Sequence, residues 1–142
     1  MGVNLRQYAD GSAGFEGKDL DEGPVIFVTM EYNASSVDKV SFVAPRAMKV
    51  VSIYGRVEVA GTDGSAVTAV IKKTASGTAI ASGTALHSST FNLKGTAATN
   101  QTLTLSTTAT DTDIAAGNAI GIDFTGTLTS ATGVISVGLR YV

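Results

Sequence analysis

The 142-residue sequence contains no cysteine, no tryptophan and only one histidine. Without cysteine the chain can form no disulfide, no thiolate metal site and no thiol nucleophile. A single histidine also excludes every mechanism that needs two. Charged residues make up only 15% of the chain, whereas typical soluble domains carry roughly 25%. A surface this poor in charge is either covered by threonine, serine and glycine or partly buried against a partner.

The residues that are present are typical of one folded domain. Hydrophobic residues make up 44% and the mean hydropathy is +0.24, whereas disordered chains are poor in apolar residues. A chain of about 150 residues buries roughly 68–70% of its unfolded surface, which is enough for one core. The net charge of −2 favours no general attraction to nucleic acid. No apolar stretch is long enough to span a membrane, and the N-terminus lacks the pattern of a secretory signal.

Residues 1–24 differ from the rest and are predicted to form an extended N-terminal arm. They contain five glycines, two cationic and five anionic residues, which gives the arm a charge of −3 and the remaining chain +1. A free segment of this composition, without a period of 2 or 3.6, is expected to be disordered. We expect the arm to become ordered against its own domain, a neighbouring copy or a different protein. The predicted contact residues of the arm are Leu5, Tyr8, Phe15 and Leu20.

Residues 25–142 are predicted to form one β-sandwich domain, because apolar and polar residues alternate with the period of 2 of half-buried strands. Residues 48–59 give the clearest alternation. Their expected core side is Val51, Ile53, Val57 and Val59. Their expected outer side is Ser52, Tyr54, Arg56 and Glu58. The other expected strands are residues 25–32, 39–44 (with Val40 and Phe42 on one face), 67–73 (with Val67, Ala69 and Ile71 inward), 79–81, 91–93, 102–105, 120–124 and 134–141 (with Tyr141 buried).

Glycine-containing turns separate these strands. Asp63-Gly64 carries the strongest short signal for a β-hairpin. Threonine, valine and isoleucine favour strands because their branched Cβ loses rotamer freedom in a helix. About eight short strands predict an all-β fold, an antiparallel β-sandwich that is jelly-roll-like. An immunoglobulin-like sandwich also fits the strand number, although its cysteine and tryptophan hallmarks are missing.

Few residues suggest chemistry. Asp111 and Asp113 would share one face of a strand and could hold Ca²⁺, but no calcium-loop spacing follows, so a turn is the favoured interpretation. His87 has no acidic neighbour in sequence and is expected to be a loop residue, with a weak pH-sensing role as the alternative. No serine stands in a nucleophile elbow. We therefore expect no enzyme activity, no catalytic residue, no metal and no cofactor.

Charged residues are expected to gather around the Ala44-Pro45 step, either as a solvated strand end or as a docking contact for an acidic partner. The expected members of this cluster are Asp38, Lys39, Arg46 and Lys49. Lys72 and Lys73 are adjacent on one expected strand. No ladder of aromatic residues accompanies them, so a stacking surface for nucleic acid is not expected.

Several segments resemble small β-sandwich proteins found on the capsids of tailed bacteriophages. Residues 42–53 are similar to the opening of those chains, in which an apolar-Ala-Pro step precedes a Lys-Val-Val strand. Residues 67–73 and 77–80 resemble the next long strand and the small-residue segment after it. Residues 114–122 are similar to an Ala-Gly-Asp-x-Ile-x-Ile step, with Asn118 where aspartate is usual, and residues 133–139 resemble the final strand. The resemblance spans approximately residues 40–142 and omits the arm.

This resemblance implies a head decoration, or cement, protein: a structural virion protein that binds the outer capsid surface and stabilises the phage head. It implies the major capsid protein as partner, a homotrimer, and a location on the virion after assembly in the host cytoplasm. No nucleic acid, membrane or small-molecule substrate is expected. Arg46 and Lys49 are predicted to contact the partner together with the arm. The same fold and the threonine-rich residues 84–90 leave a second interpretation, a receptor- or glycan-binding module of a phage fibre or tail.

Overall fold

The computed structural model describes residues 5–7, 13–15 and 24–142, and most of them lie in β-strands. The strands of the body are β3 (Ile26–Tyr32), β4 (Lys39–Val43), β5 (Met48–Val59), β6 (Thr68–Thr74), β7 (Thr84–Ala85), β8 (Phe91–Asn92), β9 (Thr99–Thr102), β10 (Asp113–Ile114), β11 (Ala119–Thr125) and β12 (Thr132–Tyr141). Two short 3₁₀ turns, η1 (Ile80–Ser82) and η2 (Ala109–Thr112), complete the body.

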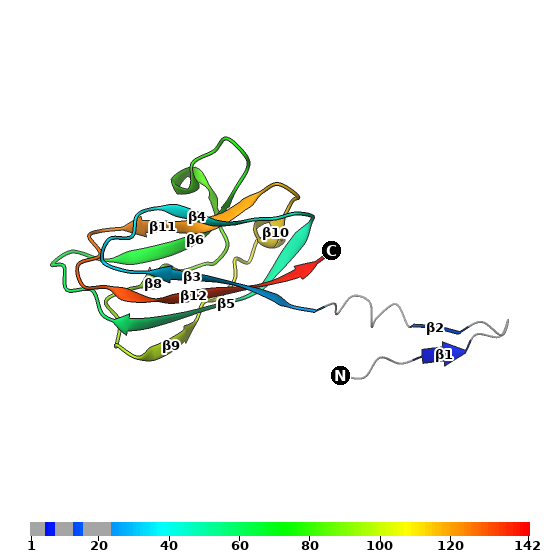
Figure 1. The fold of residues 1–142 in the computed structure, drawn as a ribbon, viewed down its shortest axis with the longest axis horizontal. Helices are drawn as coiled ribbons and strands as arrows, with labels where there is room; N and C mark the ends of the chain where they lie inside the picture. Colours follow the sequence, from blue (N-terminus) through cyan, green and yellow to red (C-terminus); the bar gives the residue numbers. More distant parts are fainter. Residues whose placement is uncertain (1–4, 8–12, 16–23) are drawn as a thin grey trace.

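Two antiparallel sheets of five strands form the body, one layer over the other (Figure 1). Sheet I has the order β10-β5-β12-β3, and β9 also pairs with β5. Sheet II has the order β4-β11-β6-β7, and β8 also pairs with β6. Neighbouring strands pair antiparallel throughout both sheets. The prediction of an all-β antiparallel sandwich is therefore confirmed.

The core lies between the inner faces of the two sheets. Its fully buried members come from both layers and include Ile53, Val57, Ala69, Ile71, Phe91, Ile120, Ile122, Ile135, Val137 and Leu139. Period-2 alternation correctly predicts most of these positions, because a strand that packs on one face must place every second side chain inward. The inward positions of Val67, Ala69 and Ile71 are confirmed in the same way.

β-Bulges make the prediction for residues 48–59 partly wrong. Gly138 pairs with Ser52 while Leu139 pairs with Val50, so Val51 is an extra residue on β5. The alternation shifts by one there, and Val50 is buried instead of Val51. A second irregularity near Thr132 leaves Val59 48% exposed. The expected outward direction of Tyr54 is confirmed, because its side chain is exposed.

Four other local predictions are wrong. Residues 79–81 form no strand, since Ile80–Ser82 is a 3₁₀ turn. The strand expected at residues 102–105 instead ends at Thr102, and Leu105 forms only an isolated bridge with His87. Asp63-Gly64 joins β5 of sheet I to β6 of sheet II, so this turn connects the two layers and closes no hairpin. Tyr141 is 38% exposed at the end of β12.

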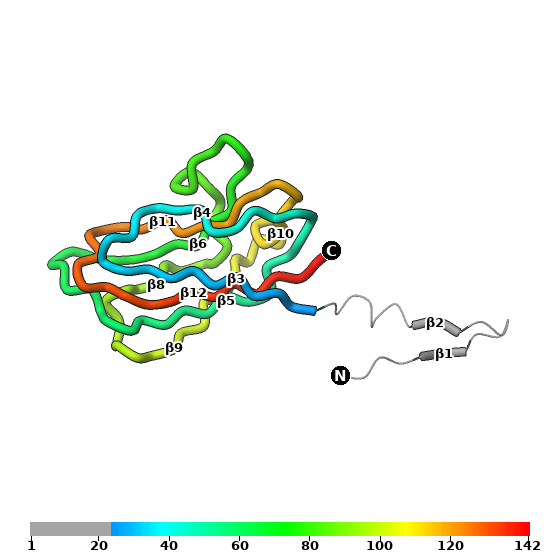
Figure 2. The backbone as a smooth tube through the Cα atoms, viewed as in Figure 1, coloured from blue at the N-terminus to red at the C-terminus, as the bar shows by residue number. Residues whose placement is uncertain are grey.

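One end of the sandwich receives the N-terminal part of the chain, and we call it the junction end. Figure 2 shows that the start of β3, the turn between β4 and β5, β10 and the C-terminus all lie there. Residues 24 and 25 lead into β3. We define the junction end by Pro24, Arg46, Lys49, Asp113 and Tyr141.

Two further strands precede the body. β1 (Leu5–Gln7) and β2 (Ala13–Phe15) pair antiparallel in a separate two-stranded sheet, with Leu5 opposite Phe15. That residues 1–24 become ordered against a partner stays a prediction.

Among the described residues, no helix is long and apolar enough to cross a membrane.

Candidate interaction surface

Two of the segments that carry the phage-capsid resemblance meet at the junction end. The Ala44 N–H donates to the Asn118 carbonyl at 2.8 Å, and the Gly117 N–H donates back to the Ala44 carbonyl at 2.8 Å. Gly117 makes this approach with a left-handed backbone, φ +81°, which glycine adopts at little cost. Asn118 uses its backbone carbonyl here, so this contact does not depend on whether an amide or a carboxylate stands at the position.

Residues 46 and 48 connect the turn between β4 and β5 to β10 and β12. Met48 pairs with Ile114 of β10 and with Tyr141 of β12. The guanidinium carbon of Arg46 lies 4.7 Å from the centroid of the Tyr141 ring, within the range of a cation–π contact. Tyr141, which the alternation pattern placed in the core, is instead partly exposed and packs against Arg46.

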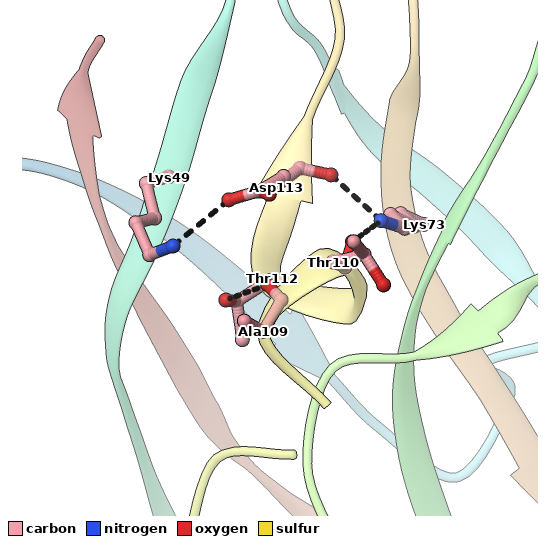
Figure 3. A network of polar contacts seen from close by, with 6 residues as sticks. All are labelled: Lys49, Lys73, Ala109, Thr110, Thr112 and Asp113. Atoms are coloured by element: carbon pink, nitrogen blue, oxygen red, sulfur yellow. Dashed lines mark hydrogen bonds and ion pairs between the residues drawn. The ribbon is translucent and has the colours of Figure 1, made fainter. Parts of the chain in front are cut away.

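Figure 3 shows how a polar network closes the same end of the sandwich. Lys49 Nζ lies 2.9 Å from Asp113 Oδ1, while Lys73 Nζ donates to the Asp113 carbonyl at 2.7 Å and to the Thr110 carbonyl. Lys49 belongs to β5 of sheet I and Lys73 to β6 of sheet II. The network therefore ties the η2 turn to both layers. The Lys49–Asp113 pair itself is about half exposed, so it contributes roughly 0–1 kcal/mol.

The two carboxylates around Thr112 bind different groups. Asp111 Oδ2 accepts a hydrogen bond from Ser106 Oγ at 2.6 Å, whereas Asp113 faces Lys49. Thr112 Oγ1 closes the η2 turn by donating to the Ala109 carbonyl at 2.9 Å. The favoured turn is confirmed for Asp111, which lies in η2, whereas Asp113 begins strand β10. Across residues 5–7, 13–15 and 24–142, no three histidine, cysteine, aspartate or glutamate side chains gather as metal ligands would.

The charged cluster expected around Ala44-Pro45 is wrong in part, because its members separate. Asp38 Oδ1 accepts the Phe124 N–H at 2.7 Å. Lys39 Nζ donates to the Glu31 carbonyl at 2.7 Å, which satisfies a carbonyl of β3. Of the four expected members of the cluster, only Arg46 and Lys49 lie at the junction end.

Apolar side chains project from the two edge strands that lie next to each other on one side of the sandwich. Phe27 of β3 is 57% exposed, and Val40 and Val43 of β4 are 47% and 58% exposed. Val40 was expected on the same face as Phe42, but a register shift opposite Ile120 and Gly121 turns it outward. Exposed strand edges of this kind tend to pair with other chains. This surface could not be predicted from the sequence, because the bulge has no local signature.

His87 is buried, although it lies outside the regular strands as expected of a loop residue. Its Nε2 accepts the backbone N–H of Ile71 at 2.9 Å, and its Nδ1 bonds the Ser89 carbonyl. An acceptor at Nε2 and a donor at Nδ1 describe a neutral imidazole. Burial lowers the pKa of His87 below its ordinary value of 6.5, while the bond to Ser89 acts in the opposite direction.

Tyr32 is a second group of the body whose pKa is shifted by burial. Burial raises the pKa of its hydroxyl to about 12, with a further contribution from the negative charge of Glu58.

Of the six predicted contact residues, the structure brings Arg46 and Lys49 together at the junction end. Leu5 and Phe15 are opposite each other in the pairing of β1 with β2. Tyr8 and Leu20 lie outside the described residues.

Comparison with protein families, with curated proteins and with solved structures finds no match to this chain.

Proposed function

We propose that this protein is a structural virion protein that binds the outer surface of a phage capsid and stabilises the head. In this role it acts as a trimeric decoration protein, and residues 1–24 contact neighbouring subunits. The major capsid protein is its partner. The proposal starts from the sequence resemblance and takes its support from the arrangement of the junction end.

The observation that carries the proposal is the convergence at one end of the sandwich. The Ala44-Pro45 step, the Gly117-Asn118 step and the C-terminal strand are joined there by backbone hydrogen bonds and strand pairing. Residues 24 and 25 lead into β3 at the same end. Arg46 is exposed there, and Val142 is 70% exposed. Because residues 1–24 join the body at the junction end, the arm and the junction end can contact the same neighbouring subunit.

A decoration protein needs many modest contacts and no chemistry. Three linked copies on one capsid surface convert later binding events into intramolecular ones, which multiplies the affinity when the geometry lets all three engage. An arm that orders on docking covers a large area, although the ordering costs free energy. The low charge of the body suits such contacts, because interface centres are depleted in charged residues.

The direct test mixes the full-length protein with mature capsids that lack a decoration protein. We expect saturable, stoichiometric binding in native salt and a higher temperature of capsid disruption, measured by sedimentation and calorimetry. Absence of binding would remove the proposal. Deletion of residues 1–24 is expected to weaken attachment while circular dichroism still reports the β-sandwich.

A matched pair of variants tests the junction end itself. Arg46→Gln removes one positive charge and the contact with the Tyr141 ring, and we expect it to weaken capsid binding about tenfold because each trimer loses the contact three times. Thr127→Glu changes the net charge by the same amount at the opposite end, in the connection between β11 and β12, and is expected to bind normally. Equal binding of the two variants would exclude Arg46 from the contact.

A further inference from the structure

The outer face of sheet I holds a shallow hollow that the capsid role does not explain. Its volume is about 290 Å³. Its lining comes from three neighbouring strands and consists of Tyr54, Gly55, Arg56, Asn100, Val134 and Ser136. Ligand pockets for drug-sized molecules measure roughly 300–1,000 Å³, so this hollow has room for about one small ring.

An exposed aromatic ring forms one wall of the hollow. Tyr54 projects from β5 and is 46% exposed, with Ser136 of β12 on one side and Thr102 of β9 on the other. A tyrosine ring offers a flat apolar face and a hydroxyl that needs a hydrogen-bonding partner. Because the two residues paired with Tyr54 are small and polar, the ring can stack against the apolar face of a ligand.

The opposite wall is polar and its groups are held in place. Arg56 is two residues along the same strand, so its side chain lies on the same face as Tyr54. Its Nη1 donates to Asn100 Oδ1 at 3.0 Å, and its Nε donates to the Glu58 carboxylate. Glu58 offsets the positive charge, whereas the Nη2 group of Arg56 and the amide nitrogen of Asn100 take no part in these two bonds. The wall is therefore a neutral set of planar donors.

The floor of the hollow is thin and supported from below. Gly55 lies between Tyr54 and Arg56, and a Cβ added there would be 2.7 Å from Cζ of Phe91. Phe91 is fully buried and meets the Tyr32 ring edge-on, with 6.5 Å between the ring centroids. The backbone at Gly55 therefore lies directly on a core ring, which supports the part of β5 that carries both walls.

We propose that this hollow binds one neutral hexopyranose unit of a glycan. The C–H face of the sugar stacks on Tyr54, and its hydroxyls accept hydrogen bonds from Arg56 and Asn100. The aromatic face matches the apolar side of a pyranose, the planar donors match its hydroxyl rim, and the Arg56–Glu58 pair favours a neutral sugar over an acidic one. The proposal does not depend on the capsid role, and the site is distinct from the threonine-rich residues 84–90.

The test titrates full-length ¹⁵N-labelled protein with methyl β-galactopyranoside and methyl α-glucopyranoside, to concentrations on the order of 100 mM. We expect saturable shifts of the backbone amides of Tyr54, Gly55, Arg56, Asn100 and Ser136, with a millimolar Kd for at least one of the two sugars. Shifts that do not saturate, or that gather elsewhere, would overturn the proposal. Tighter binding of methyl β-glucuronide would overturn the neutral ligand class.

Three variants separate stacking from a general effect on the surface. Tyr54→Ala is expected to weaken sugar binding about tenfold, whereas Tyr54→Phe keeps the ring and should bind within about threefold of the unaltered protein. Tyr141→Ala removes the other partly exposed tyrosine of the body and should leave the Kd unchanged. Undiminished binding by Tyr54→Ala, or equal loss in Tyr141→Ala, would refute the role of Tyr54.

Discussion

His87 links the stability of the fold to pH. The neutral ring accepts the Ile71 N–H, and a protonated ring has no acceptor, so protonation breaks this buried bond. Because the pKa of His87 is lower in the folded protein than in the unfolded chain, the stabilisation is complete above pH 6.5 and is lost as the pH falls through the folded value. We expect the free energy of unfolding to decrease between pH 7 and pH 5, by at most about 1.4 kcal/mol per pH unit for one proton.

The measurement is urea unfolding at a series of pH values. The chain has no other histidine, so the variant His87→Gln should remove the slope between pH 5 and pH 7. Glutamine can still accept the Ile71 N–H, although we expect about 1–3 kcal/mol of lost stability at pH 7 if its oxygen fails to reach. Parallel slopes in the two proteins would show that other groups cause the pH dependence.

On the scale of secondary-structure elements, the approach of β4 to β11 depends on a glycine. A Cβ added at Gly121 would lie 2.3 Å from the carbonyl oxygen of Lys39 and 2.9 Å from Cα of Val40. The backbone of β4 bulges over this position, because Ile120 pairs with Phe42 while Gly121 pairs with Val40. The substitution Gly121→Ala should therefore push the edge strand away and destabilise the protein by about 1–3 kcal/mol.

Gly64→Ala is the matched control for this prediction. Apart from its two chain neighbours, no atom of the described residues lies within 4 Å of a Cβ added at Gly64, and its backbone is outside the left-handed region. Alanine there should be neutral or stabilise by roughly 0.4–1 kcal/mol, because it reduces the freedom of the unfolded chain. Chemical denaturation of the two variants gives the comparison. Equal stabilities would mean that β4 can move aside without cost.

The strands of the body could largely be predicted from the sequence, because each buries one face. Residues 67–73 show this best, since β6 has no bulge opposite β11 and every expected core position is buried. The prediction fails where the direction of a side chain, or the connection between two strands, depends on which strand lies alongside. Val51 is displaced by a bulge in the pairing of β5 with β12, and Asp63-Gly64 has hairpin composition but connects two sheets. Period and turn composition contain no information about which strand lies alongside.

The candidate sites, too, could be predicted only in part from the sequence. The outward direction of Tyr54 and Arg56 follows from alternation along one strand. Asn100 could not be added to them from sequence, because the pairing of Tyr54 with Thr102 aligns β9 with β5 and the expected strand was placed three residues later. In the same way, Arg46 was predictable as an exposed turn residue, whereas its contact with Tyr141 depends on the pairing of Met48 with the end of β12.

On the scale of the whole molecule, the exposed edges of the sandwich favour self-association. β3 and β4 end sheets I and II on one side, and Phe27, Val40 and Val43 are all at least 47% exposed there. Association would cover these side chains and the open edges, which otherwise invite aggregation. We expect light scattering of the full-length protein to give three times the 14.4 kDa chain mass, with dissociation on dilution.

Two valine substitutions of similar exposure test whether this edge forms the trimer contact. Val43→Lys places a charge on the β4 edge, where 58% of the residue is exposed, and should convert the trimer to monomers. Val59→Lys places the same charge at the end of β5 farthest from the junction end, where 48% is exposed, and should leave the mass unchanged. The reason is that a charge buried in an apolar contact without a partner costs several kcal/mol. A monomeric unaltered protein, or a trimer that survives Val43→Lys, would show that the edge strands meet no second copy.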